Sequence, residues 1–122
     1  MIEVLVILAI IGVVAGMAIP WFATYRARGY DARVEADARN AAAAEAVVFL
    51  DTNAYTISGS CDALPGITLS TGVTCTLGVA ICPDDSPGFT VSTSHNLASR
   101  SCTWNSCGQT CADGSSGNLC CS

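Results

Sequence analysis

Apolar residues dominate the first 22 positions of the chain, MIEVLVILAIIGVVAGMAIPWF. A run of this length can cross a bilayer as a single helix. The exceptions are Glu3, an acid near its start, and Pro20, a helix breaker near its end. A cleaved secretory signal is disfavoured, because the run has no basic start and is longer than a usual signal core. We therefore predict a membrane anchor, and Arg26 and Arg28 directly after it are typical of a positive-inside flank.

The helical pattern continues through residues 23–51, which are rich in alanine, arginine and glutamate. Glu35 and Arg39 stand four residues apart, in the order that stabilises a helix. We expect one helix from residue 2 to about residue 51, whose second half packs on the rest of the protein. A narrow apolar face is predicted on that half at helical spacing, comprising Ala32, Ala36, Ala43, Val47 and Leu50.

The length of this helix limits what can cover it. At about 1.5 Å per residue it is roughly 75 Å long. The residues that follow can form a head about 25–30 Å across, which covers only the second half of the helix. The apolar first half must therefore be buried by lipid or by copies of itself.

Short polar and β-like runs replace the helical pattern after residue 51. A turn-rich stretch at 51–66 predicts a loop. Runs at 67–82, 88–95 and 99–105 predict antiparallel strands, with a turn at 95–98 between the last two. The tail shows no period and is expected to be held by its cysteines.

These patterns predict an α+β fold: a long N-terminal helix and a small antiparallel β-sheet head stapled by disulfides. Residues 1–22 form the half of the helix that lies in a membrane or a filament core. Residues 23–51 form the amphipathic half, which packs on the head. Residues 52–122 form the disulfide-rich β head.

The cysteines indicate a disulfide framework and hence an oxidising compartment. A metal site is disfavoured because the cysteines lack the close pairs typical of zinc ligands and the chain has one histidine. Neighbouring Cys120 and Cys121 should bond to different partners, since a bridge between neighbours is strained. The pairing is otherwise open. We predict disulfides, and neither metal nor other cofactor, at Cys61, Cys75, Cys82, Cys102, Cys107, Cys111, Cys120 and Cys121.

The charge balance argues against nucleic acid as a partner. The chain has a net charge of -5 and no lysine, and acids interrupt its cluster of arginines. An enzyme is also disfavoured, because no Ser/His/Asp set or pair of catalytic carboxylates stands out. His95 is expected to be a solvated side chain at the end of a strand, and no catalytic residue is predicted.

Four residues of the apolar run are candidate assembly positions. Glu3 either is solvated at the bilayer edge, where it suits the positive end of the helix dipole, or pairs with an N-terminal ammonium group. Gly12 and Gly16 form a G-x-x-x-G pattern that lets helices approach closely. Pro20 removes a backbone donor one turn after Gly16. Together they suggest a segment that can bend or unwind.

This segment resembles the N-terminal segment of type IV pilins and of the pseudopilins of type II secretion. The family's glutamate, glycine and proline match Glu3, Gly12 and Pro20, and the close match covers residues 1–22. The resemblance implies an inner-membrane precursor, cleavage of a leader by a prepilin peptidase, methylation of the new N-terminus, and a homopolymeric filament built by pilus assembly machinery. It also implies that Glu3 neutralises the amine of an adjacent subunit, and that the stretch from Gly12 to Pro20 loses helicity in the filament.

One feature departs from the family pattern. The family's processing site lies four positions before the glutamate, whereas Met1 is two positions before Glu3. Methylation of Met1 is therefore in doubt, and the amine that pairs with Glu3 can belong to a residue upstream.

We expect a structural subunit of a type IV pilus, first in the inner membrane and then in an extracellular filament used for adhesion, motility or a related task. The alternative is a pseudopilin or minor pilin of a secretion or DNA-uptake system. Trp21, Phe22 and Tyr25 are expected to pack between subunits. Electron transport along an aromatic row is the less favoured reading of Trp21, Phe22, Tyr25, Tyr30, Phe49 and Tyr55.

Overall fold

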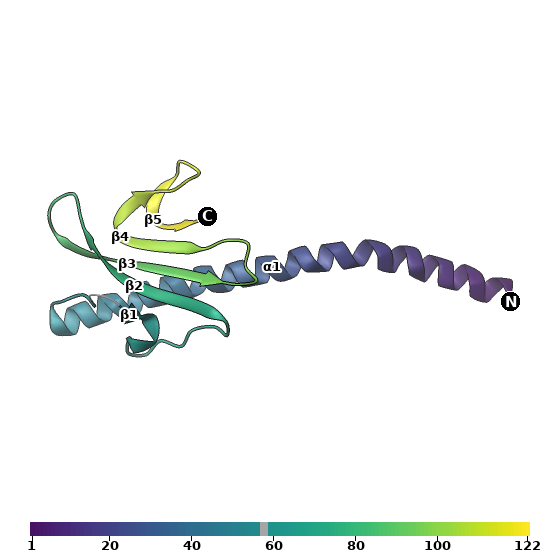
Figure 1. The fold of residues 1–122 in the computed structure, drawn as a ribbon, viewed down its shortest axis with the longest axis horizontal. Coiled ribbons are helices and arrows are strands. Elements are labelled where there is room, and N and C mark those ends of the chain that lie inside the picture. Colours follow the sequence, from purple (N-terminus) through teal and green to yellow (C-terminus); the bar gives the residue numbers. More distant parts are fainter. Residues whose placement is uncertain (57–58) are drawn as a thin grey trace.

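The protein consists of a long helix with a β-sheet laid across its second half (Figure 1). The computed structural model describes residues 1–56 and 59–122, and at Pro20 it describes the backbone alone. The predicted α+β class is confirmed. The described elements are α1 (Ile2–Thr52), β1 (Gly59–Ser60), the 3₁₀ turn η1 (Cys61–Ala63), β2 (Val73–Ile81), β3 (Pro87–His95), β4 (Cys102–Thr110) and β5 (Ser116–Cys121).

Helix α1 is continuous from Ile2 to Thr52, as the sequence predicted. It passes through Pro20 without a break in its helical assignment, and Figure 1 shows a gentle curve in its N-terminal half. It ends at Asn53, which adopts a left-handed conformation with φ of 55°. The backbone N–H of Asn53 donates to the carbonyl of Phe49 at 2.8 Å, which satisfies one of the free carbonyls of the last turn.

The sheet is an antiparallel meander in the order β1-β2-β3-β4-β5. Strands β2 and β3 pair along their full length, from Val73 opposite His95 to Ile81 opposite Pro87. The predicted turn at 95–98 is confirmed, because the N–H of Ala98 donates to the carbonyl of His95 at 3.1 Å. The first predicted strand was too long, since residues 67–72 precede β2 and are not strand.

The tail and the predicted loop contain more regular structure than the sequence analysis proposed. Strand β4 extends to Thr110 and β5 occupies Ser116–Cys121, where no period was recognised, while β1 and η1 lie within the predicted loop. In the tail the reason is a local sequence, Cys-x-Asp-x-Ser, that occurs at two hairpins: Cys82–Ser86 joins β2 to β3, and Cys111–Ser115 joins β4 to β5.

Both hairpin tips use the same hydrogen bonds. The cysteine N–H donates to the serine carbonyl, at 3.0 Å for Cys82 and 2.7 Å for Cys111. An aspartate oxygen accepts from the backbone N–H of the serine two residues later, at 3.3 Å in the first tip and 2.9 Å in the second. The fourth position is left-handed in each, with φ of 59° at Asp85 and 82° at Gly114. Turn chemistry therefore gives the tail a hairpin that hydrophobic periodicity does not reveal.

All eight cysteines form disulfides, which confirms the predicted framework. The bridges are Cys61–Cys75, Cys82–Cys107, Cys102–Cys121 and Cys111–Cys120. Cys120 and Cys121 bond to different partners, as expected. The bridges link η1 to β2, the tip after β2 to β4, and β4 and its hairpin to β5. Strand β3 has no cysteine but lies within the loop that Cys82–Cys107 closes.

The helix face that packs on the sheet is not the predicted apolar face. Ala32, Ala36, Ala43, Val47 and Leu50 are all exposed. The buried face instead consists of Asp31, Val34, Asp37, Ala38, Ala41, Ala42 and Glu45. Alanines on this face allow the sheet to approach closely, and Phe89 and Val91 of β3 and Cys75 and Leu77 of β2 complete the core. The buried face was not predicted, because alanines line both sides of the helix and the buried side also contains acids.

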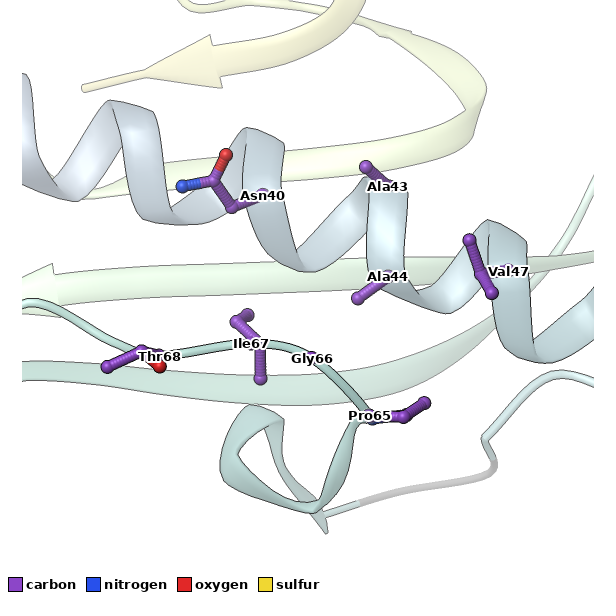
Figure 2. A pocket seen from close by; sticks show the side chains of 8 residues that line it. All are labelled: Asn40, Ala43, Ala44, Val47, Pro65, Gly66, Ile67 and Thr68. Atoms are coloured by element: carbon purple, nitrogen blue, oxygen red, sulfur yellow. The ribbon is translucent and has the colours of Figure 1, made fainter.

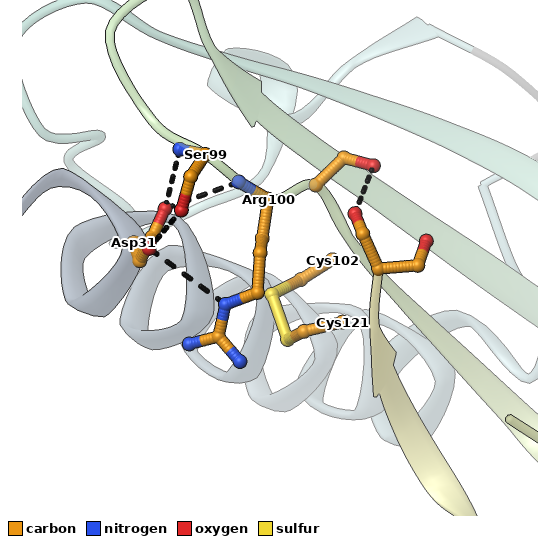
Figure 3. Close-up of polar contacts among 7 residues, drawn as sticks. Asp31, Ser99, Arg100, Cys102 and Cys121 are labelled. Carbon is orange, nitrogen blue, oxygen red and sulfur yellow. Dashed lines mark hydrogen bonds and ion pairs between the residues drawn. A yellow bond between two sulfur atoms is a disulfide. The ribbon is translucent and has the colours of Figure 1, made fainter. Parts of the chain in front are cut away.

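Three acids on the buried face attach separate loops to α1. Asp31 accepts hydrogen bonds from the Ser99 hydroxyl at 2.6 Å and from the N–H groups of Ser99 and Arg100 at 2.7 and 3.1 Å (Figure 3). The Nε atom of the Arg100 guanidinium lies 3.7 Å from Oδ2 of Asp31. Each remaining acid contacts one loop: Asp37 accepts from the N–H and hydroxyl of Ser70, and Glu45 accepts from the N–H of Thr56.

Asp31→Asn should destabilise the head by about 2 kcal/mol, because hydrogen bonds to charged groups contribute about 1.5–3 kcal/mol and an amide NH₂ would face other donors. Denaturant unfolding of the disulfide-intact protein, followed by near-UV circular dichroism, measures the change. Asp51→Asn, at an exposed position near the end of α1, is the matched control and should change the free energy of unfolding by less than about 0.5 kcal/mol.

The same variant should alter the acid sensitivity of the head. The Ser99 hydroxyl, the backbone donors and Arg100 lower the pKa of Asp31 from its usual 3.8. Its stabilising contribution is therefore complete above the unfolded-state pKa and is lost as the pH falls through the lower folded-state pKa. We expect stability to decrease below about pH 4 and Asp31→Asn to remove part of that decrease. An unchanged acid profile would contradict the role of Asp31.

Candidate assembly interface

The N-terminal half of α1 has no cover from the rest of the protein. It projects beyond the sheet (Figure 1), and every described side chain from Met1 to Arg26 is exposed. Leu5 is 65% exposed and Ile19 is 73% exposed, although both are large aliphatic residues. By length and composition α1 can span a membrane, and it is the single such helix among the described residues. Exposed apolar area on this scale marks a surface that lipid or protein covers.

Glu3 lies in the first turn of α1, and its side chain is exposed. The ion pairs within residues 1–56 and 59–122 are Glu35–Arg39 and Asp31–Arg100, so Glu3 has no cationic partner in that part of the chain. Its position suits the positive end of the helix dipole. The carboxylate is therefore accessible to water or to a group from another molecule.

Gly12 and Gly16 are not required by packing inside this chain. A Cβ atom added at either position would meet nothing within 4 Å. Their small size can therefore matter only to something that approaches the helix from outside. The unwinding expected between Gly12 and Pro20 is absent from the single chain, where the backbone is helical throughout. The side chain of Pro20 lies outside the described residues.

A stripe of small and apolar residues, interrupted at Arg39 and Asn40, runs along α1 and is here called the α1 seam. Its members recur at intervals of three, four or seven residues, and all of them are exposed: Val14, Ala18, Trp21, Tyr25, Gly29, Ala32, Ala36, Ala43, Val47 and Leu50. Since a helix turns about 100° per residue, the part from Ala32 to Leu50 faces away from the sheet. This spacing is typical of a surface that packs against another helix.

The predicted packing aromatics lie on and beside this seam. Trp21, Phe22 and Tyr25 are all exposed, and with Val14, Met17 and Ala18 they line an open apolar hollow of about 480 Å³. A second hollow adjoins the other end of the seam, between α1 residues 40–47 and loop residues 65–68, with a volume of about 510 Å³ (Figure 2). The seam therefore passes between two depressions into which neighbouring side chains can fit.

His95 is better packed than the sequence analysis expected. It ends β3, as predicted, but its ring is half-buried and stacks on Tyr30 with 4.4 Å between ring centres. Its Nδ1 accepts a hydrogen bond from the N–H of Leu97 at 3.0 Å, so the ring stabilises the turn that follows β3. Among the described residues no three histidine, cysteine, aspartate or glutamate side chains are grouped as a metal site would require.

The aromatic residues do not form a continuous row within one chain. Phe49 stacks on Tyr55 at 4.3 Å, and Tyr55 lies 5.0 Å from Phe89. Tyr30 and Phe49 are 19 residues apart on α1, which is roughly 28 Å. Any longer row would need aromatic rings from other copies.

Comparison with protein-family models, curated proteins and solved structures finds no match to this chain. Its shape is compatible with that of a pilin, since a long apolar N-terminal helix is joined to an antiparallel sheet with disulfides. The seam residues of the second helical half were predicted from the sequence as an apolar face, without a partner being assigned to that face. The three buried acids were missed, although Asp31, Ala38 and Glu45 share one helical face.

The two faces of α1 can be distinguished by substituting adjacent alanines. Ala42 is 5% exposed against the sheet, whereas Ala43 lies on the seam. Ala42→Leu should lower the free energy of unfolding by about 1–3 kcal/mol, because a larger side chain at this buried position would push the sheet away from the helix. Ala43→Leu should change it by less than about 0.5 kcal/mol. Equal destabilisation in denaturant unfolding would show that Ala43 also faces the core.

Proposed function

We propose that this chain is a structural subunit that polymerises through α1 into a filament of the type IV pilus kind. The observation that supports the proposal most directly is that one helix has both a bare apolar half and an exposed packing seam that continues along its other half. The resemblance of residues 1–22 to pilins supports it independently.

Lipid alone cannot cover the exposed apolar surface of α1. The hydrocarbon core of a bilayer is about 30 Å thick and covers about 20 helical residues. The seam continues to Leu50, which lies 28 residues beyond Phe22, or roughly 42 Å along the helix. Small residues at Gly29, Ala32, Ala36 and Ala43 favour close approach of a second helix over contact with water.

The arrangement favours an open polymer over a closed dimer. If the bare half of one copy packs on the part of the seam from Ala32 to Leu50 in another, the two partners contribute different surfaces to the contact. Such a heterologous contact repeats along a helical path and generates a filament when the rotation does not close. Burial of the apolar helices is then the driving force for assembly.

The proposed assembly gives Glu3 a defined role. An unpaired carboxylate in an apolar bundle costs several kcal/mol. Packing arrangements that place a cation beside Glu3 are therefore favoured. By resemblance, that cation is the N-terminal amine of an adjacent copy. Gly12, Gly16 and Pro20 form the part of α1 that can adjust its shape as the bundle forms.

The head would then face water outside the cell, where its four disulfides are stable. The precursor would be held in the inner membrane by residues 1–22, and its processing and assembly would need the peptidase and machinery that the resemblance implies.

Arginine substitutions on the seam test the proposal. Ala36→Arg and Ala43→Arg should each reduce filament yield at least tenfold, because a long charged side chain keeps the helices apart. Ala112→Arg places the same change on the exposed hairpin tip between β4 and β5 and should leave the yield unchanged. Filaments are counted by electron microscopy of material sheared from the cell surface. Near-UV circular dichroism shows whether the heads are folded. Normal filaments from both seam variants would contradict the proposal, while short, scarce wild-type filaments would favour a pseudopilin.

Glu3→Ala should leave the subunit in the membrane but reduce polymerisation severalfold. Glu3→Gln is the matched variant, since it keeps the size and polarity of the side chain and removes its charge. Both variants should show the same loss in a membrane-to-filament fractionation if a charge pair is required. Wild-type filament yield from Glu3→Ala would refute the charge-pair role.

A further inference from the structure

Three exposed arginines follow the apolar half of α1 and are here called the arginine collar: Arg26, Arg28 and Arg33. Each guanidinium lies near an aromatic ring of the same helix. The distances to the ring centres are 6.0 Å for Arg26 and Phe22, 6.0 Å for Arg28 and Tyr25, and 5.3 Å for Arg33 and Tyr30. Arg26 also donates to the Tyr30 hydroxyl at 3.5 Å. These contacts hold the cations close to the helix without neutralising them.

The collar charges are not compensated within the described part of the chain. Its ion pairs join Arg39 to Glu35 and Arg100 to Asp31, and neither pair includes a collar residue. Asp31, the acid within the collar region, is 5% exposed and is directed toward Ser99 and Arg100 (Figure 3). Three positive charges are therefore presented to the surroundings by a protein whose net charge is -5.

The collar surrounds the helix instead of forming a one-sided patch. Arg26 and Arg33 are seven residues apart and share a side, whereas Arg28 points to the opposite side. A single protein partner would approach one face of the unassembled subunit, but a lipid surface meets a spanning helix on all sides. The collar also lies directly after an apolar segment about one bilayer thick, among aromatic residues typical of the membrane interface.

Membrane topology does not explain these arginines. Arginines beside a membrane span favour the cytoplasmic side, whereas the disulfides place the head, and the collar with it, on the oxidising side. The collar therefore lies on the side of the membrane opposite to the one that the positive-inside rule favours. A binding role on the head side of the membrane would explain its charges.

We propose that the arginine collar binds the phosphate groups of anionic phospholipids on the head side of the membrane and holds the unassembled subunit at a fixed depth. The inference rests on the membrane-inserted precursor of the proposed function and is independent of polymerisation. A guanidinium binds phosphate through two parallel hydrogen bonds, which makes arginine better suited to this contact than lysine. The aromatic rings beneath the guanidinium groups lie at the level of the headgroups.

Lipid selectivity of the reconstituted full-length chain tests this inference. The chain is placed, before assembly, in vesicles of phosphatidylcholine and phosphatidylglycerol in which one lipid or the other has brominated acyl chains. Bromine quenches the fluorescence of nearby Trp21, while Trp104 in β4 gives a constant background. We expect phosphatidylglycerol to be favoured by about five- to tenfold around the wild-type helix. The preference should decrease in 0.5 M salt, and millimolar inorganic phosphate should not abolish it.

The triple variant R26Q/R28Q/R33Q should reduce the preference to about onefold. R39Q is the matched control, since Arg39 lies on the same helix but is paired with Glu35 at 2.7 Å, and it should behave as wild type. Equal selectivity in the wild type and the triple variant would overturn the inference, and so would an equal loss in R39Q. A triple variant that keeps the lipid preference but fails to polymerise would assign the collar to contacts between copies. Absence of quenching by either lipid would overturn the membrane placement, whereas filament yield tests polymerisation separately.

Discussion

The mismatch in length between α1 and the head determines how this protein is organised. The helix has 51 residues, and the sheet covers only its second half (Figure 1). No rearrangement of so small a head could bury the other half, because a domain of this size is much shorter than the helix. The apolar half therefore needs a cover that the head cannot provide, and under the proposed function lipid and then the helices of other copies provide it.

Attachment of the head to α1 depends on polar contacts as much as on apolar burial. Alanines at the interface bring the sheet close, but they bury little apolar area compared with larger side chains. Asp31, Asp37 and Glu45 each accept hydrogen bonds from a different loop, which specifies one register between helix and sheet. Because alanines and acids form the face that holds the sheet, larger apolar residues of the helix, such as Val47 and Leu50, remain exposed on the opposite face.

Several features could be predicted from the sequence because each depends on a local or repeated signal. The extent of α1 follows from a long, uninterrupted helical pattern, and the separate partners of Cys120 and Cys121 follow from covalent geometry. The Cys-x-Asp-x-Ser tips were also visible in the sequence, but they were not recognised as hairpin signals. The orientation of α1 could not be predicted, because an acid on a helix usually indicates solvent and its loop donors come from residues distant in sequence.

The positions of the disulfides determine how the protein would respond to tension. All four bridges lie between Cys61 and Cys121, and none reaches α1. The sheet is thus closed on itself covalently but is joined to the helix only by the chain after Thr52 and by noncovalent contacts. In the proposed filament, a pulling force would travel through the α1 helices and largely bypass the sheets. Heads could then detach and reseat without unravelling, while the strength of the fibre would reside in its helices.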